Sequence, residues 1–209
     1  KIVQLVGGRR VRQKDNPNFN KYYKFPNIKN VPDIFDETDE VVITRKIHGS
    51  NARYGIVKKN NISRWSRFIN LFKRDPWFEY EYIYGSHNVQ KGSDSQGFYS
   101  TDVWKEIADK YNLKEKLWAF VKDLDRTTLG SGFIIYGEIY GQGIQGDKYS
   151  YGLKTKELAL FDIEINGEYI DTPNFNQITN MLVLPTVENL YIGNWSKEIQ
   201  DSFVTNSYI

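Results

Sequence analysis

Residues 133–141 have the sequence FIIYGEIYG, and this stretch is the strongest indication of the fold. Its β-branched and aromatic residues predict a strand over residues 133–139, with Glu138 as the one carboxylate inside it. Burying a glutamate in an apolar strand is costly unless the carboxylate binds something, such as a ribose hydroxyl or a metal ion. The alternative is a glutamate on an edge strand that faces water.

A second apolar strand is predicted over residues 158–165, and a short third strand over 169–170 follows a turn at Asn166 and Gly167. Phe161 lies within the second strand. A phenylalanine there is either an ordinary core residue or a ring on which a base stacks.

Further strands and helices are predicted on both sides of this pair. Residues 41–47 and 52–57 are expected to form a hairpin, and residues 79–85 another strand before a loop over 86–99. Two helices separated at Asn112 are predicted within 101–124, another from Thr172 as cap with Pro173 first, and a last one over 195–204. Residues 1–40 should hold little regular structure. Helices and hairpins that do not alternate regularly indicate an α+β fold with mainly antiparallel strands.

Lys46 comes at the end of the first predicted strand, and Gly49 follows three residues later in the turn. A lysine so placed points its amine into the space beside the sheet, where it can act as a nucleophile once it is neutral. The alternative is a solvated lysine at a strand end. Taken alone, a lysine and a glycine three positions apart are a weak signal.

Residues 58–77 form a basic and aromatic insertion. Trp65, Phe68, Ile69 and Phe72 follow helical spacing, and Ser63 precedes them as a cap. The cations in and beside this helix are candidate RNA contacts: Arg64, Arg67, Lys73 and Arg74. Two alternatives stay open, namely a membrane-surface helix and a helix that packs its aromatic residues on the sheet beneath a solvated basic face.

Composition limits the classes of protein further. The 209 residues carry 28 Lys+Arg against 26 Asp+Glu, so any basic surface must be local. The chain has no cysteine, which excludes disulfides, thiolate nucleophiles and zinc–thiolate sites and fits a cytoplasmic protein. No apolar run is long enough to cross a membrane, so no membrane partner is expected. Nothing in the sequence indicates a protein partner.

Four stretches in order give the sequence a family resemblance: TRKIHGSN at 44–51, YGSHN at 84–88, YGEIYG at 136–141 and FDI at 161–163. Together they resemble the covalent nucleotidyltransferases, and most of all the ATP-dependent RNA ligases of the bacteriophage nick-sealing and trypanosome editing branch. This resemblance implies an α+β nucleotidyltransferase fold of the ATP-grasp-like ligase type, with antiparallel sheets flanking a nucleotide cleft.

The resemblance also implies roles for single residues. Lys46 is similar to the lysine that attacks the α-phosphate of ATP, and Gly49 to the glycine that lets the backbone approach the nucleotide. Asn51 matches an asparagine associated with the ribose and the nick, and Glu138 the carboxylate that holds the ribose or a metal. Phe161 matches the ring stacked on adenine. The implied cofactors are ATP and Mg²⁺, and the implied substrate is RNA with 3′-hydroxyl and 5′-phosphate ends.

The sequence departs from the family pattern at three places. Arg45 stands where the branch often has a glutamate that helps to recognise adenine, and His87 replaces an arginine that contacts phosphate. Both remain candidate nucleotide contacts. The two late family motifs, a carboxylate strand and a lysine pair, are not found after residue 171. We therefore expect residues 1–209 to be a single adenylyltransferase domain truncated before those motifs.

Two alternative functions remain at this stage. A catalytically dead, RNA-binding relative would explain the missing late motifs, and a capping-type guanylyltransferase would use GTP in place of ATP. The Ser50-Asn51 pair after Gly49 fits the ligase branch better than the capping enzymes.

Overall fold

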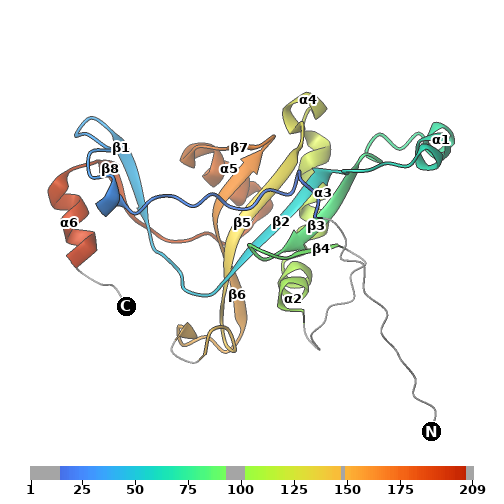
Figure 1. Cartoon of the computed structure of the whole chain (residues 1–209). Helices are drawn as coiled ribbons and strands as arrows, with labels where there is room; N and C mark the ends of the chain where they lie inside the picture. Colours follow the sequence, from blue (N-terminus) through green and yellow to red (C-terminus); the bar gives the residue numbers. More distant parts are fainter. Residues whose placement is uncertain (1–14, 93–101, 147–148, 206–209) are drawn as a thin grey trace, which may run out of the picture.

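The computed structural model describes residues 15–92, 102–146 and 149–205, and in these residues six α-helices accompany two antiparallel sheets (Figure 1). The larger sheet has the strand order β4-β3-β2-β5-β6-β7. Its strands are β2 (Ser50–Lys58), β3 (Tyr80–Gly85), β4 (Gln90–Gly92), β5 (Gly132–Gly141), β6 (Lys156–Ile165) and β7 (Glu168–Tyr169). The predicted strands at 79–85, 133–139 and 158–165 are therefore confirmed, whereas β4 occupies part of the predicted loop at 86–99.

The smaller sheet pairs β1 (Glu40–Thr44) with β8 (Asn189–Asn194). The predicted hairpin between residues 41–47 and 52–57 is wrong, because β2 pairs with β3 and β5 and not with β1. Residues 45–48 leave β1 as irregular backbone and carry the chain across to the larger sheet. The position of Lys46 in this connection, between two sheets, depends on a pairing with a strand that lies far along the chain.

One face of the larger sheet packs on helices α2 (Val103–Lys110), α3 (Leu113–Asp123) and α5 (Thr172–Leu182). Side chains at alternate strand positions face this core, for example Tyr54, Ile56 and Ile135, all with 0% exposure. Asn112 separates α2 from α3 in the left-handed conformation, as predicted. The cap of α5 is Asp171, whose side chain accepts a hydrogen bond from the backbone N–H of Asn174, and not the predicted Thr172.

The opposite face of the sheet is covered in part by residues 15–25, which cross it on the way to β1 (Figure 1). Phe19 is buried there in a cluster with Ile83, Ile134 and Tyr136. Asn16 fastens the segment by donating from Nδ2 to the backbone oxygen of Lys58 at 3.0 Å. Residues 15–25 are held in place by contacts with the sheet and not by helix formation. Among residues 15–39, the only helix is the short 3-10 helix Ile28–Asn30.

The basic insertion forms an arm between β2 and β3 that carries α1 (Arg64–Lys73) at its tip (Figure 1). Ser63 caps α1 as predicted, by accepting a hydrogen bond from the backbone N–H of Ser66. None of the residues of α1 is buried. The interpretation in which its aromatic residues pack on the sheet is therefore wrong.

Two helices complete the description: the single turn α4 (Arg126–Leu129) and α6 (Lys197–Thr205), which confirms the last predicted helix. Within the described residues, no helix has both the length and the apolar character needed to cross a membrane.

Candidate active site

The candidate site lies where β2 begins and β5 ends, on the face of the sheet opposite the helices. Asn51 pairs in register with Glu138, so the two side chains lie on the same face. That face is the one that carries Tyr136, two residues before Glu138 on β5, and it is opposite the face of the helix-covered core. Because β5 lies between β2 and β6, Glu138 is on a central strand, and the edge-strand alternative is wrong.

Gly49 joins the lysine motif to the glutamate motif. Its backbone N–H donates to Oε1 of Glu138 at 3.1 Å. A Cβ at this position would come 2.1 Å from the backbone oxygen of Ile139, so no larger residue fits without moving β5. A glycine is needed at this position because the turn and β5 approach each other backbone to backbone. The sequence did not predict this contact with β5.

The environment of Glu138 shifts its pKa. Burial raises the pKa to about 7, and the Gly49 N–H and the positive charge of Lys46 act in the opposite direction. A hydroxyl donor or a positive charge on a ligand would stabilise the ionised form of this carboxyl group. Its second oxygen has no hydrogen bond within the described residues, so it is available to such a ligand.

Lys46 is exposed in the connection from β1 to β2. The preceding residue, Arg45, is tied to Glu188 twice: its backbone N–H donates to the Glu188 backbone oxygen at 2.8 Å, and its Nε lies 2.7 Å from Glu188 Oε2. The backbone on one side of Lys46 is thus held against the start of β8. The guanidinium of Arg45 forms an ion pair with Glu188. Its role as a nucleotide contact stays a prediction.

Two residues of the loop between β5 and β6 hold the other side of the Lys46 turn. The hydroxyl of Tyr151 accepts from the backbone N–H of His48 at 2.8 Å, and Nε2 of Gln145 donates to the backbone oxygen of Gly49 at 2.8 Å. Sequence reasoning missed both residues. The glycines at 141, 143 and 146 marked the loop, but its contact with a turn almost a hundred residues earlier leaves no local pattern.

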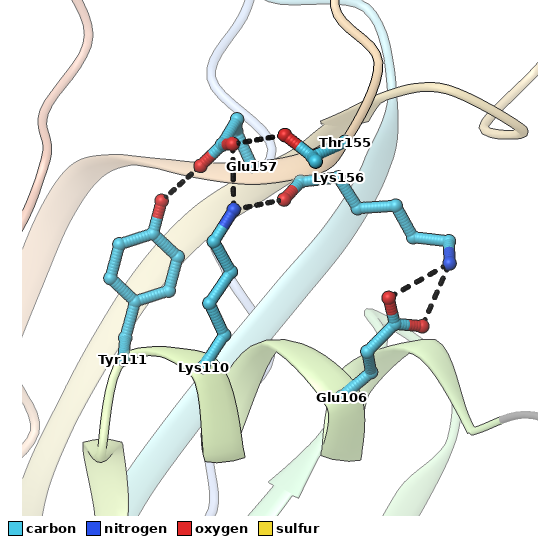
Figure 2. Close-up of polar contacts among 6 residues, drawn as sticks. All are labelled: Glu106, Lys110, Tyr111, Thr155, Lys156 and Glu157. Carbon is cyan, nitrogen blue, oxygen red and sulfur yellow. Dashed lines mark hydrogen bonds and ion pairs between the residues drawn. The ribbon is translucent and has the colours of Figure 1, made fainter.

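The base of this loop is fastened to α2 by a network of six polar side chains, shown in Figure 2: Glu106, Lys110, Tyr111, Thr155, Lys156 and Glu157. Glu157 accepts from Lys110 Nζ at 2.6 Å, from the Tyr111 hydroxyl at 2.5 Å and from Thr155 Oγ1 at 2.7 Å. Partial burial raises the pKa of Glu157, but these donors outweigh it and lower the pKa to about 2. The loop that holds the Lys46 turn is therefore anchored where it ends and β6 begins.

Asn51 contributes an acceptor without a partner. Its Oδ1 is buried and has no hydrogen bond within the described part of the chain. The strand around it is fixed, because the indole N–H of Trp104 donates to the Asn51 backbone oxygen at 3.1 Å. A buried, unpaired amide oxygen costs stability unless a ligand supplies a donor, so Asn51 fits a contact with a hydroxyl or amino group.

Phe161 is turned towards the same face by an irregularity in β6. The register between β5 and β6 shifts at Tyr136 and Gly137, where Phe161 is the extra residue opposite the shift. Its ring is half-buried and packs edge-on against Tyr22, with ring centroids 4.9 Å apart. Tyr22 also donates to Oδ2 of Asp162 at 3.0 Å. Sequence reasoning missed Tyr22, because it comes from the segment that crosses the sheet.

His87 follows β3 on the same side of the sheet, near two lysines of the crossing segment. Burial lowers the pKa of His87, and the charges of Lys21, Arg53 and Lys24 lower it further. Arg53 itself is 2% exposed and donates from Nε to the backbone oxygen of Ser86 at 3.0 Å, which fixes the start of the His87 loop. Lys21, Lys24 and Arg53 make a positive local field that suits a phosphate, and the same field favours the neutral form of His87.

The predicted RNA contacts do not join this cluster. Arg64, Arg67, Lys73 and Arg74 lie on α1 and at its end, beyond the opposite end of β2 from Lys46. Nine residues of β2 separate the two places, which corresponds to roughly 30 Å of strand. Lys46, Gly49, Asn51, Glu138, Phe161 and His87 thus belong to one region of the molecule, and the α1 cations to another.

The described residues do not include a group of three or more His, Cys, Asp or Glu side chains that could hold a metal ion by themselves. Mg²⁺ in nucleotide sites is usually held by one or two carboxylates, with substrate phosphates and water completing the shell. Glu138, with one oxygen available, fits that mode. The arrangement as a whole offers an amine, a carboxylate, an aromatic ring and a positive field within one region. These groups suit the binding and activation of a nucleoside triphosphate.

Comparison with known proteins gives a family and a fold. A family model described as RNA ligase matches residues 39–206. No curated protein matches the sequence. The fold is similar to that of an RNA ligase from Naegleria gruberi, solved as a variant with AMP and Mn (TM-score 0.62, 17% identity, covering 90% of this chain and 48% of that chain). A variant with ATP and Mn gives a TM-score of 0.59 at 17% identity and covers 87% and 46% of the two chains.

The same ligase with pyrophosphate gives a TM-score of 0.54 at 17% identity, and covers 87% of this chain and 49% of that chain. This chain therefore spans about half of the length of the ligase that it resembles. At this level of identity the likeness shows the fold, which is the predicted α+β nucleotidyltransferase fold with antiparallel sheets.

Proposed function

This chain belongs to the RNA ligase family, and we propose that it joins RNA ends in an ATP-dependent reaction in which Lys46 takes up AMP. One observation supports the proposal above the others. The hydrogen bond from the Gly49 N–H to Glu138 brings the lysine turn to the carboxylate of β5, with the unpaired Asn51 oxygen beside them. Two distant parts of the chain, residues 46–51 and strand β5, thus converge at the place where a nucleotide would be activated.

The proposed reaction has three steps. The neutral amine of Lys46 attacks the α-phosphorus of ATP, so that a P–N bond forms, pyrophosphate leaves and the nitrogen releases a proton to solvent. An oxygen of an RNA 5′-phosphate then attacks the same phosphorus and breaks the P–N bond, which leaves AMP on the RNA end through a new phosphoanhydride. Finally the RNA 3′-hydroxyl loses its proton and attacks the 5′-phosphate, which forms the phosphodiester and releases AMP.

Each site residue has a part in this proposal. The fixed turn positions Lys46 for attack, since the contacts at Arg45, His48 and Gly49 hold the backbone around it. Glu138 accepts from a ribose hydroxyl. Phe161 offers its ring to adenine.

The groups that face the phosphates complete the proposed site. Asn51 meets the ribose or the RNA end through its unpaired Oδ1. His87 can donate a hydrogen bond to a phosphate, and Lys21 and Lys24 nearby supply positive charge on the side where phosphates would lie.

A divalent cation belongs to this proposal, and Glu138 is the residue that would hold it together with the phosphates of ATP. Two of the Naegleria structures contain Mn, and we propose Mg²⁺ as the ion for this chain. Such an ion would neutralise phosphate charge and help pyrophosphate to leave. Within the family, the motifs at 44–51 and 136–141 support the bacteriophage and trypanosome editing branch.

A covalent labelling assay tests the proposal. The chain is incubated with α-labelled ATP and Mg²⁺ and separated on a denaturing gel beside Lys46→Ala and, as a matched control, Lys105→Ala on α2. We expect label on the parent and on the control variant, and none on Lys46→Ala. Absence of label from the folded parent with both ATP and GTP would contradict the enzyme proposal, and label from GTP alone would indicate a capping-type enzyme.

A further inference from the structure

Helix α1 exposes an unusual amount of aromatic surface at the tip of its arm. Trp65 is 68% exposed, Phe68 49% and Phe72 75%, and the helix has no buried residue. Single exposed apolar residues are common, but a cluster of three rings on one short helix indicates an interaction site. The hydrogen bond from the Lys59 backbone N–H to the Glu79 backbone oxygen at 2.8 Å closes the base of the arm, and α1 lies at its tip, away from the sheets (Figure 1).

The rings form a row. Trp65 and Phe68 are stacked, with centroids 5.5 Å apart and planes inclined by 22°, and Phe68 meets Phe72 edge-on at 5.3 Å. These contacts order the rings while leaving most of their surface open. Ordered, open aromatic faces are the surface on which unpaired bases stack.

The arm carries only positive charge up to the end of α1, and Asp75 just after the helix is its first acidic residue. Residues 58–74 contain no aspartate or glutamate, and they include the following cations: Lys58, Lys59, Arg64, Arg67, Lys73 and Arg74. The global charge of the chain is only +2, so this is a local concentration of positive charge. A polymer with one negative charge per nucleotide complements it.

A groove at the base of the arm continues this character. It has a volume of about 950 Å³ and is lined in part by three lysines, two carboxylates and two tryptophan rings: Lys59, Lys114, Lys122, Asp75, Glu115, Trp77 and Trp118. The groove adjoins α1 directly. Asp75, which lines the groove, accepts a hydrogen bond at its backbone oxygen from Nδ2 of Asn70 on α1, at 3.2 Å. Lysines and tryptophans thus extend from the helix onto the body of the molecule.

We propose that α1 and this groove bind an unpaired stretch of the RNA substrate, with cations on the backbone and rings on the bases. The inference rests on the proposed function for its choice of RNA. A lipid surface is the other occupant to consider, because Trp65, Phe68 and Phe72 share one face of α1. RNA is the occupant that we favour, because the lysines and tryptophans continue from the helix into the groove on the body, where a membrane-surface helix would need no further contact.

The distance from Lys46 gives the site a separate task. With roughly 30 Å of β2 between them, α1 cannot contact a nucleotide at Lys46. It would hold RNA at a distance from the ends being joined and increase the time that the substrate stays bound. Adenylylation of Lys46 needs no RNA and should not depend on α1.

The first test measures binding of a fluorescent oligouridylate of about 20 nucleotides to the full chain without ATP, over a series of salt concentrations. The variant with Arg64, Arg67, Lys73 and Arg74 all changed to Gln should weaken binding and lower the salt slope by about 3, since each phosphate contact on a single strand contributes about 0.7.

A matched pair of double variants controls for net charge. Arg67→Gln with Lys73→Gln should lower the slope, whereas Lys105→Gln with Lys197→Gln removes the same charge from ion-paired sites on α2 and α6 and should not. Equal effects of the two pairs would overturn the inference.

The rings have a different signature. Trp65→Ala with Phe72→Ala should weaken binding about tenfold at high salt, where stacking dominates, and leave the salt slope unchanged. Sedimentation with vesicles of phosphatidylcholine and phosphatidylserine tests the other occupant. Vesicle binding lost in the ring variant, with RNA binding unchanged, would replace the inference with a membrane contact. RNA binding that depends on α1 in a chain that takes no label from ATP would keep this inference while the proposed function fails.

Discussion

The two ends of strand β2 show opposite ways of using side chains. At the Ser50 end, the backbone of the Lys46 turn is held by Glu138, Gln145 and Tyr151, with a glycine that admits no extra atom. At the Lys58 end, the α1 helix leaves its rings and cations in solvent. The comparison teaches that the proposed chemistry depends on fixed geometry, which tolerates little change, whereas the proposed RNA contact depends on charge and open rings.

The largest effect is expected from Gly49→Ala, which tests whether the Ser50 end is as tightly fitted as its contacts indicate. The new Cβ would lie 2.1 Å from the Ile139 backbone oxygen, so β5 or the turn must move. We expect a loss of about 2–3 kcal/mol in the free energy of unfolding and at least about a hundredfold loss of labelling from ATP. Urea denaturation and the labelling assay measure the two quantities.

Gly143→Ala is the matched control. This glycine has a φ of +75°, but a Cβ added to it would meet no atom of the described residues within 4 Å, so its substitution tests backbone strain without a clash. It should cost only about 1 kcal/mol. If both variants behaved alike, the close approach at Gly49 would not be the reason for the glycine.

Much of the fold follows from local sequence pattern. The strands β3, β5 and β6 were predictable because β-branched and aromatic runs favour a pleated, half-buried conformation, and the break at Asn112 because its side chain tolerates the left-handed region. The pairing of β1 with β8 was not predictable. The paired residues lie 145 to 154 positions apart, and antiparallel pairing over that separation leaves no signal in either segment.

The candidate site divides in the same way. Lys46, Gly49 and Glu138 were found because their motifs are contiguous in sequence, and the structure brings them together. Tyr22 and Tyr151 were missed because each reaches the site from a distant loop or segment through a single hydroxyl or ring. A tyrosine in a loop has no pattern that separates such a role from ordinary packing.

Glu138→Gln should have the next largest effect. Loss of the carboxylate should lower labelling on the order of a hundredfold. The pKa of Glu138 is raised from 4.5 to about 7, so the folded state binds its proton more tightly than the unfolded state does. The stability from this group is therefore full below about pH 4.5 and is lost as the pH rises to about 7.

Glutamine does not titrate, so Glu138→Gln should be more stable relative to the parent at about pH 8 than at about pH 5. Urea denaturation with a chelator and without nucleotide measures the difference at each pH. A relative stability that does not change with pH would contradict the assigned environment of the carboxyl group.

Glu157→Gln tests whether the rigidity of the Ser50 end extends to the anchor of its loop (Figure 2). The pKa of Glu157 is lowered to about 2, so its contribution to stability is present above about pH 4.5 and is lost as the pH falls towards 2. We expect a loss of about 1–2 kcal/mol in the free energy of unfolding at neutral pH and less than a tenfold change in labelling. A loss that stayed constant down to acid pH would contradict the role of the ionised carboxylate.

The smallest effect is expected at the other end of β2, where Phe72→Ala should change the free energy of unfolding by no more than about 0.5 kcal/mol. Phe72 is 75% exposed, so removing its ring opens no cavity. Phe120→Ala is the matched control, because Phe120 is 8% exposed and packs on Phe133 at 4.8 Å, and its loss should cost about 3–5 kcal/mol. A large loss at Phe72 would mean that α1 packs on the body in solution, and the contrast between the two ends of β2 would then fail.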